Sequence, residues 1–436
     1  MPDLSPTKTL FTDLPLDQKL QKTLAELNLK QATPVQAQTI PLALEQKDLL
    51  VSAQTGSGKT NAYLLPTLHQ FLANPEKNTN GTRALILVPT RELAQQVLKH
   101  CNELTQKTSI KAAAITGGND FKYQSAILRK NPEIVIATPG RLLELLEKGK
   151  IHFNTLEVLI LDEADRILDM GFRDDVLTII NQCHQQRQSL LFSATLQHQG
   201  LNDILDQVVQ SPEIVAIHSV KDQHNSITQQ IILADNKSHK EKLLHWLLSN
   251  ETYKKALIFT NTRIQAEQLG SLMRYHKFKA GVLHGEIKQT QRKKILQSFS
   301  QGTITVLVAS DVAARGLDIK DVDLVINLDL PRNSNDYIHR IGRTGRAGEK
   351  GLAITLIAPA QWNAMISTER YLNTTFERRS IKGLKAKFTG PKKLKSSGKA
   401  TGSKHKKNNN KKTSKPANKS WGNKPIDGFA PLKKKK

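Results

Sequence analysis

Cysteine is scarce in this sequence. Its 436 residues include two cysteines, Cys101 and Cys183, and neither belongs to a CxxC pair or to a Cys/His spacing typical of metal sites. A disulfide framework is therefore excluded, and we interpret both as free buried thiols of a reducing compartment. Long apolar runs are also absent, since no stretch approaches the roughly 18 apolar residues of a transmembrane helix, and the N-terminus lacks a basic region followed by an apolar core. We therefore expect a soluble, cytoplasmic protein without membrane association.

Acidic residues are nearly missing from the end of the chain. Residues 383–436 contain 18 lysines, no arginine and one acid, Asp427, so this segment accounts for +17 of the net charge of +25. Hydrophobic periodicity ends after Glu377, and the Lys, Asn, Ser, Gly and Thr that follow cannot bury enough apolar surface to offset chain entropy. We therefore predict that residues 383–436 form a disordered tail whose charge favours a polyanionic partner.

The length and patterning predict two α/β domains. The chain is longer than one ordinary domain, and 38% hydrophobic residues suffice for packed cores. Short apolar runs alternate with helical stretches in two cycles, which is typical of doubly wound parallel sheets. The expected divisions are an N-terminal helical segment (1–30), a first domain (31–219), a polar linker (220–226) and a second domain (227–377). The expected strands are 48–53, 83–88, 111–116, 134–137, 158–161, 189–192, 214–217, 229–233, 256–259, 281–283, 305–309, 324–327 and 352–357.

A glycine-containing loop connects the first of these strands to a helix. Residues 54–60 have the sequence Gln-Thr-Gly-Ser-Gly-Lys-Thr, in the strand, loop and helix order that a phosphate-binding loop requires. The glycines allow successive N–H groups and the positive end of the helix to surround a phosphate. Lys59 would reach the β- and γ-phosphates, and the Thr60 hydroxyl would coordinate Mg²⁺. Ala53 replaces the first glycine of the usual pattern, one small residue for another. The predicted nucleotide contacts here are Thr55, Gly56, Ser57, Gly58, Lys59 and Thr60.

A cluster of carboxylates follows the apolar run Val158–Leu161. The run is typical of a buried parallel strand, and it breaks directly into Asp162, Glu163, Ala164 and Asp165. The carboxylates would therefore lie at the C-terminal end of the strand, where open α/β sheets bind their ligands. An acidic turn after a strand is common and carries little information alone. Its combination with the phosphate-binding loop makes a role in nucleotide chemistry the stronger interpretation.

Polar motifs follow most of the other expected strands as well, and together they resemble one family. In chain order they are Gln36, Ala53–Thr60, Pro89–Ala94, Gly117-Gly118, Thr138–Arg141, Asp162–Asp165, Ser193–Thr195, Phe259, His284-Gly285, Ser310–Ile319 and His339–Gly348. This ordered set, spanning about residues 10–375, resembles the DEAD-box RNA helicases of helicase superfamily 2. The acidic motif is literally Asp-Glu-Ala-Asp, and Tyr337–Arg346 is the most specific stretch. The resemblance implies two tandem RecA-like domains followed by the disordered basic tail.

The resemblance also implies how the acidic motif would act on ATP. Asp162 would hold Mg²⁺ through water, because Mg²⁺ keeps much of its hydration shell. Glu163 would orient and deprotonate the attacking water, since phosphoryl transfer depends on positioning and charge stabilisation. Asp165 and His339 would connect the acidic motif to the second domain.

The second domain has no glycine-lysine loop of its own, so it would complete the site on the first. Arg343 and Arg346 are spaced to lie on one side of a helical turn, and the family match favours a pair of arginine fingers over a solvated basic face or salt bridges. Gly316 and Asp318 would contribute further nucleotide contacts. The site would then be complete only when the two domains close.

Adenine recognition is expected from a motif near the N-terminus. The resemblance implies that Gln36 contacts the adenine edge and that Phe11 stacks on its face. The sequence departs from the family pattern at Asn28 and Ala32, where Gly and Pro are usual. Gln36 and Phe11 are both retained, so we expect a preference for ATP.

RNA contacts in this family are made to the sugar-phosphate backbone. Hydroxyls, glycine N–H groups and arginines bind phosphate without identifying bases, and Ser310 keeps the hydroxyl of the usual threonine. The matching positions are Thr90, Arg91, Gly118, Thr138, Arg141, Gly285, Ser310 and Arg315. The motif Ser193, Ala194 and Thr195 would couple the ATP state to domain closure.

We therefore predict a monomeric ATP-dependent RNA helicase that uses ATP and Mg²⁺ to separate short duplexes or remodel RNA–protein complexes. An ATP-gated RNA clamp whose hydrolysis times release is the main alternative, and a DNA helicase is a weaker one. Ribosome-assembly and RNA-decay proteins are compatible partners. The tail would tether RNA through its lysines, with Trp421 and Phe429 available for stacking. A solubilising extension is the alternative for the tail. Lys433–Lys436 also resemble a nuclear signal, but the compact N-terminus favours a bacterial member of the family.

Overall fold

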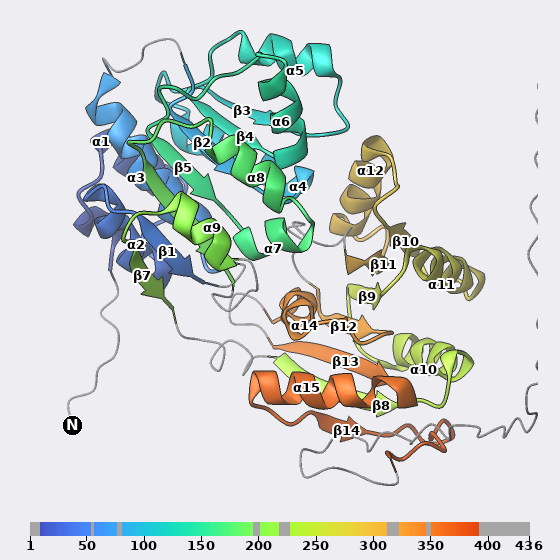
Figure 1. Cartoon of the computed structure of the whole chain (residues 1–436). Helices are drawn as coiled ribbons and strands as arrows, with labels where there is room; N and C mark the ends of the chain where they lie inside the picture. The colour runs from blue at the N-terminus through green and yellow to red at the C-terminus, as the bar shows by residue number, and fades with distance from the viewer. Residues whose placement is uncertain are drawn as a thin grey trace, which may run out of the picture.

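The computed structural model describes residues 9–53, 56–75, 81–194, 201–217, 227–311, 322–345 and 350–391. These residues form two domains, each built on a parallel seven-stranded sheet with flanking helices (Figure 1). The predicted architecture of two tandem parallel-sheet domains is confirmed. The predicted linker at 220–226 lies outside the described residues. Over the described part of the chain, no helix combines the length and apolarity needed to cross a membrane.

The first domain contains the sheet β3-β4-β2-β5-β6-β1-β7, in which every neighbouring pair is parallel. Its strands are β1 (Leu49–Ser52), β2 (Ala84–Leu87), β3 (Ala112–Ile115), β4 (Ile134–Ala137), β5 (Val158–Leu161), β6 (Gln188–Ser193) and β7 (Glu213–Ala216). Its helices are η1 (Phe11–Asp13), α1 (Gln18–Glu26), α2 (Pro34–Leu44), α3 (Lys59–Ala73), α4 (Arg91–Thr105), α5 (Phe121–Leu128), α6 (Pro139–Glu147), α7 (Ala164–Asp169), α8 (Arg173–Ile180) and α9 (Leu201–Val208).

The second domain repeats this plan with the sheet β10-β11-β9-β12-β13-β8-β14, again parallel throughout. Its strands are β8 (Ile227–Leu233), β9 (Ala256–Thr260), β10 (Ala280–Leu283), β11 (Val306–Ser310), β12 (Leu324–Asn327), β13 (Gly351–Ile357) and β14 (Glu377–Arg379). Its helices are α10 (Lys237–Asn250), α11 (Arg263–Tyr275), α12 (Gln289–Ser300), α14 (Ser334–Ile341), η4 (Pro359–Gln361) and α15 (Trp362–Leu372).

The central strands are buried on both faces, which explains their continuous apolar sequences. In β5, Val158 and Ile160 belong to the core on one side of the sheet, whereas Leu159 and Leu161 belong to the core on the other. The two cysteines are buried free thiols, as predicted, and burial raises the pKa of each to about 12. Neither thiol is therefore suited to nucleophilic chemistry.

The end of the second domain differs from the prediction. The strand β14 has the sequence Glu-Arg-Arg, which contains no apolar residue, and it pairs with β8 at the edge of the sheet. Residues 383–391 also pack on the domain, so the prediction of disorder from residue 383 is wrong for this stretch. The backbone N–H groups of Lys387 and Phe388 donate to the Asp235 carboxylate at 3.1 and 2.8 Å, and Phe388 packs edge-on against Trp362. Residues 392–436 lie outside the described part of the chain.

Candidate functional site

Three adjacent strands, β5, β6 and β1, bring the predicted nucleotide residues of the first domain together at the carboxyl ends of the strands. Lys59 and Thr60 follow β1 at the start of α3, Ser193 and Ala194 lie at the end of β6, and Asp162 follows β5. The backbone N–H of Ala53 donates to the carbonyl of Ser193 at 3.0 Å, which fixes the start of the loop against β6. The strand order, rather than the distance along the chain, therefore makes these motifs neighbours.

The glycine loop has the backbone conformation that its sequence predicts. Gly56 and Gly58 have φ values of +86° and +94°, in the left-handed region that favours glycine. Gly58 directly precedes the 15-residue helix α3, whose first N–H groups point back along the helix axis. A Cβ atom on Gly58 would lie 2.4 Å from the Gln36 amide nitrogen, so a larger side chain there would have to displace Gln36 from the loop. The loop and helix therefore provide the N–H groups and partial positive charge that bind a phosphate.

Buried polar atoms in this corner lack partners within the protein. The Lys59 ammonium and the Asp162 Oδ1 oxygen are both buried, and neither has a hydrogen-bond partner among the described residues. Burial raises the pKa of the Asp162 carboxyl, and the charge of Lys59 opposes that rise. Burial likewise raises the pKa of Asp165, where Arg166 and Lys59 oppose it. Because buried polar atoms are normally hydrogen-bonded, these donors and acceptors fit a bound phosphate and a hydrated cation.

Glu163 occupies a distinctive place at the end of β5. Its φ of +54° lies in the left-handed region, and it is the N-cap residue of α7. The Arg166 guanidinium donates to Oε2 of Glu163 at 3.0 Å, and both side chains are buried. Arg166 therefore fixes the direction of the Glu163 carboxylate. The sequence analysis did not identify Arg166, although its one-turn spacing from Glu163 was a usable signal.

The predicted adenine residues are both buried. The Gln36 side-chain amide donates to the Gly58 carbonyl at 2.9 Å and accepts from the Thr33 N–H at 2.9 Å. Gln36 is thus connected directly to the phosphate-binding loop. The Phe11 ring is 4% exposed and packs into the core of the first domain. Asn28 has a φ of +57°, so it adopts the left-handed turn for which the family usually has glycine.

The predicted RNA residues of the first domain also follow the carboxyl ends of strands, at β3, β4 and β2 in the other half of the sheet. The Thr90 hydroxyl accepts from the Leu93 N–H at 3.2 Å and caps α4. The Arg91 side chain lies against Gly118, because a Cβ atom on Gly118 would be 2.1 Å from its guanidinium. Arg141 donates to the Asn119 carbonyl at 2.9 Å, and Thr138 is buried at the end of β4. These groups form one continuous row at the strand ends.

In the second domain, Gly285 follows β10 and Ser310 ends β11, on the corresponding half of that sheet. Arg343 and His339 are buried, and the backbone N–H of Arg343 donates to the Arg340 carbonyl at 3.2 Å. The remaining predicted site residues lie outside the described part of the chain. They are Thr55, Thr195, Arg315, Gly316, Asp318 and Arg346.

Arg340 links the strand ends of the second domain, a role that the sequence analysis did not identify. Its guanidinium donates to both carboxylate oxygens of Asp311 at 2.6 and 2.7 Å, to the Asn261 side chain at 2.8 Å and to the Asp329 carbonyl at 2.6 Å. The side chain is 2% exposed. Asn261, Asp311 and Asp329 follow β9, β11 and β12, so one arginine holds three strand ends in place.

A second unpredicted contact connects the two domains. The Arg292 guanidinium of α12 lies 2.7 Å from the Glu92 carboxylate in the first turn of α4, and both side chains are largely buried. Burial lowers the pKa of Arg292, and the positive charge of Arg91, a predicted RNA residue, lowers it further. The ion pair therefore joins the second domain to the part of α4 that begins at the predicted RNA row.

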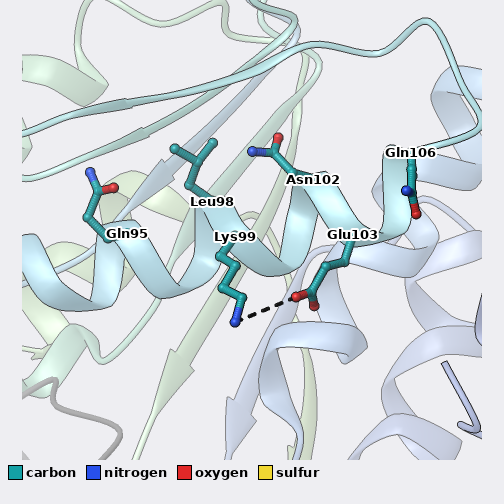
Figure 2. Close-up of a pocket in the computed structure, with 6 residues that line it drawn as sticks. All are labelled: Gln95, Leu98, Lys99, Asn102, Glu103 and Gln106. Carbon is teal, nitrogen blue, oxygen red and sulfur yellow. Dashed lines mark ion pairs between the residues drawn. The ribbon is translucent and has the colours of Figure 1, made fainter. Parts of the chain in front are cut away.

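A pocket of about 450 Å³ lies on α4, away from these strand ends. Figure 2 shows its lining, which comes from α4 and its C-cap residue Gln106, with Lys99 and Glu103 forming an ion pair at 3.8 Å. It contains none of the predicted site residues.

Comparisons with known proteins agree with this geometry. The DEAD/DEAH box helicase family model matches residues 33–204, and the model of the helicase conserved C-terminal domain matches residues 238–348. The ATP-dependent RNA helicase SrmB of Escherichia coli is 39% identical over 385 residues, which cover 88% of this chain and 87% of that protein. The ATP-dependent RNA helicase CshA of Listeria monocytogenes is 40% identical over 353 residues, covering 81% of this chain and 67% of the relative.

Solved structures resemble both domains together. Dbp5 of S. cerevisiae bound to RNA and ADP BeF3 aligns with a TM-score of 0.77 at 28% identity, over 85% of this chain and 95% of that chain. Mss116p bound to single-stranded RNA and AMP-PNP aligns with a TM-score of 0.77 at 28% identity, over 88% of this chain and 82% of that chain. Each similarity covers enough of this chain to include both sheets.

Proposed function

This chain belongs to the DEAD-box family of ATP-dependent RNA helicases, and from that premise we propose how its own residues divide the work. The single observation that supports the division is the strand order of the first sheet. It places Lys59, Asp162 and Glu163 after β1 and β5, and it places Thr90 and Thr138 after β2 and β4 in the other half of the sheet. The carboxyl ends of one sheet can therefore hold the ATP phosphates and the RNA backbone side by side.

For ATP, the first turn of α3 and Lys59 would bind the phosphates. Thr60 and Asp162 would hold Mg²⁺, which would neutralise charge on the β- and γ-phosphates. Glu163 would orient the attacking water and accept its proton, with its carboxylate directed by Arg166. Asp165 and His339 would connect the acidic motif to the second domain.

The second domain would complete the ATP site on closure. Arg343 and Arg346 would stabilise charge on the transferring phosphoryl group, and Gly316 and Asp318 would add nucleotide contacts. Ser193, Ala194 and Thr195 would couple the ATP state to that movement. Gln36 would contact adenine, and its hydrogen bond to the Gly58 carbonyl would link adenine binding to the phosphate loop. Phe11 would stack on the base.

RNA would be bound along the row of hydroxyls, glycine N–H groups and arginines on both domains. Such groups bind phosphates without identifying bases, so the contacts would be largely independent of sequence. Strand separation would follow because closure bends or displaces a short duplex, and hydrolysis would then release the retained strand. The proposed contacts are Thr90, Arg91, Gly118, Thr138, Arg141, Gly285, Ser310 and Arg315.

The purified chain tests this proposal through RNA-stimulated ATP hydrolysis and the unwinding of a short fluorescent RNA duplex. We expect hydrolysis to rise with single-stranded RNA and unwinding to require ATP. Matched DNA strands should stimulate hydrolysis less than RNA. Robust hydrolysis that is indifferent to RNA would contradict the proposal. Long-lived ATP-bound RNA complexes without strand separation would favour a clamp.

The ion pair between Glu92 and Arg292 predicts a charge-reversal phenotype. Arg292→Glu should raise the RNA concentration for half-maximal ATPase about 10-fold, because coupling between sites is typically 1–3 kcal/mol and closure would then bring two carboxylates together. Glu92→Arg should act similarly, and the double exchange should recover part of the loss. Lys294→Glu, an exposed reversal in the same helix, is the control. Identical defects in the single and double variants would contradict an ion pair that acts across the domains.

The basic tail predicts a salt-dependent contribution to RNA binding. Removing residues 392–436, which contain 16 lysines, should lower RNA affinity about 10-fold at low salt and flatten the slope of log affinity against log salt. The cut preserves residues 383–391, which pack on the second domain. Basal ATPase should not change. A full-length variant with these lysines replaced by glutamine separates charge from length, and an unchanged slope in it would contradict an RNA tether.

A further inference from the structure

A buried tyrosine hydroxyl lies against the proposed metal residues. Tyr63 is in α3, one turn after Lys59 and Thr60, and its side chain is fully buried. Its hydroxyl donates to Oδ2 of Asp162 at 3.0 Å. The side chain of Thr60 also influences the pKa of this hydroxyl, so it lies nearby. One hydroxyl is thus bonded to Asp162 and close to Thr60, the two residues that are proposed to hold Mg²⁺.

The aromatic ring and the hydroxyl of Tyr63 have separable roles. The ring packs edge-on against Phe192 of β6, with centroids 5.2 Å apart, and belongs to the core of the first domain. Phenylalanine would fill this space equally well. A buried hydroxyl, in contrast, costs free energy unless it is hydrogen-bonded. The hydroxyl is therefore accounted for by its polar partners and not by the packing of the core.

The hydrogen bond leaves Asp162 asymmetric. Oδ2 accepts from Tyr63, whereas Oδ1 is buried and has no hydrogen-bond partner in the part of the chain that the structure describes. A carboxylate held at one oxygen cannot rotate freely about its Cβ–Cγ bond. The bond to Tyr63 therefore restricts the position of Oδ1.

We propose that Tyr63 is a positioning residue for the metal site, and that its hydroxyl sets the Mg²⁺ requirement of nucleotide binding by holding Asp162 in place beside Thr60. This inference depends on the proposed roles of Thr60 and Asp162 as metal residues. Partners of this kind orient the groups that face a metal, and their loss typically lowers metal affinity 10- to 100-fold, so about 10-fold is expected here.

The test is Tyr63→Phe in the full chain, because this change removes one oxygen and keeps the ring. Binding of a fluorescent ADP is measured by titrating Mg²⁺, and again in EDTA. We expect the Mg²⁺ concentration for half-maximal binding to rise about 10-fold, whereas affinity in EDTA stays the same. A hydroxyl with only a structural role would lower the melting temperature and leave the Mg²⁺ requirement unchanged.

A matched control is Tyr337→Phe. Tyr337 is also fully buried, and its hydroxyl donates to the Gln229 side chain in the second domain at 3.1 Å, away from the proposed metal residues. It should leave the Mg²⁺ requirement unchanged. A second comparison sets Asp162→Asn beside the double variant Asp162→Asn with Tyr63→Phe. The two should have the same Mg²⁺ requirement, because the hydroxyl acts through Asp162. An equal additional shift in that background would overturn the inference, as would an unshifted Mg²⁺ requirement in Tyr63→Phe alone.

The wild-type titration separates this inference from the proposed function. If nucleotide binding by the wild type is indifferent to Mg²⁺, the assignment of Thr60 and Asp162 as metal residues fails. If the wild type requires Mg²⁺ and Tyr63→Phe requires it equally, the assignment stands and the role of Tyr63 fails.

Discussion

Replacing Glu163 with glutamine is expected to lower RNA-stimulated ATP hydrolysis about 10²- to 10⁴-fold, the contribution that a positioned general base typically makes. The amide has nearly the same shape and can still accept from Arg166 through its carbonyl oxygen, so the turn after β5 should persist. It cannot take a proton from water. Binding of ATP and RNA should therefore survive while turnover is lost.

Single-turnover hydrolysis with saturating RNA measures this effect directly. Filter binding of RNA in the presence of ATP should show complexes at least as stable as those of the wild type, because release follows hydrolysis. Glu213→Gln is the control, since Glu213 lies in β7 and forms an exposed ion pair with Lys47. Hydrolysis within about 10-fold of the wild type would assign the general base to another residue.

The second large effect is expected on stability. Arg340→Ala should destabilise the second domain by about 3–5 kcal/mol, because breaking a buried ion pair leaves an uncompensated charge. The lost contacts include the paired bonds to Asp311 and the bonds to Asn261 and Asp329. Arg340→Lys should recover only part of the loss, since an ammonium cannot reproduce the planar fork of a guanidinium.

Urea unfolding monitored by tryptophan fluorescence reports on this domain. Trp246 and Trp362 lie in the second domain, Trp421 lies in the tail, and residues 31–219 contain no tryptophan. The control is Arg332→Ala, which removes an exposed arginine of the same domain. Equal midpoints for Arg340→Ala and the wild type would show that the Arg340 contacts do not stabilise the domain.

Elements with a strong local pattern could be predicted from sequence. The runs Ile134–Ala137, Val158–Leu161 and Leu324–Asn327 form strands at the predicted residues, because a strand buried on both faces needs apolar residues throughout. The loop conformation at Gly56 and Gly58 could also be predicted, because few other residues adopt their backbone angles. In each case the sequence pattern and the physical constraint coincide.

Elements that depend on distant partners could not be predicted. The strand β14 is charged throughout and exists because β8 offers an open edge. Residues 383–391 have the composition of a tail, but the Asp235 carboxylate fixes their backbone. The pairs Glu92–Arg292 and Tyr63–Asp162 join residues far apart in sequence, so no local pattern pointed to Arg292 or Tyr63 as the partner.

The left-handed backbone at Glu163 has a consequence for how this protein can change over time. A non-glycine residue in such a conformation typically costs about 1–3 kcal/mol. Glycine or asparagine at this position would relieve part of that cost, but neither could act as the general base. Selection for heat tolerance alone would therefore favour a substitution of Glu163 that also abolishes turnover. Any lineage that keeps the glutamate must recover the lost stability elsewhere in the first domain.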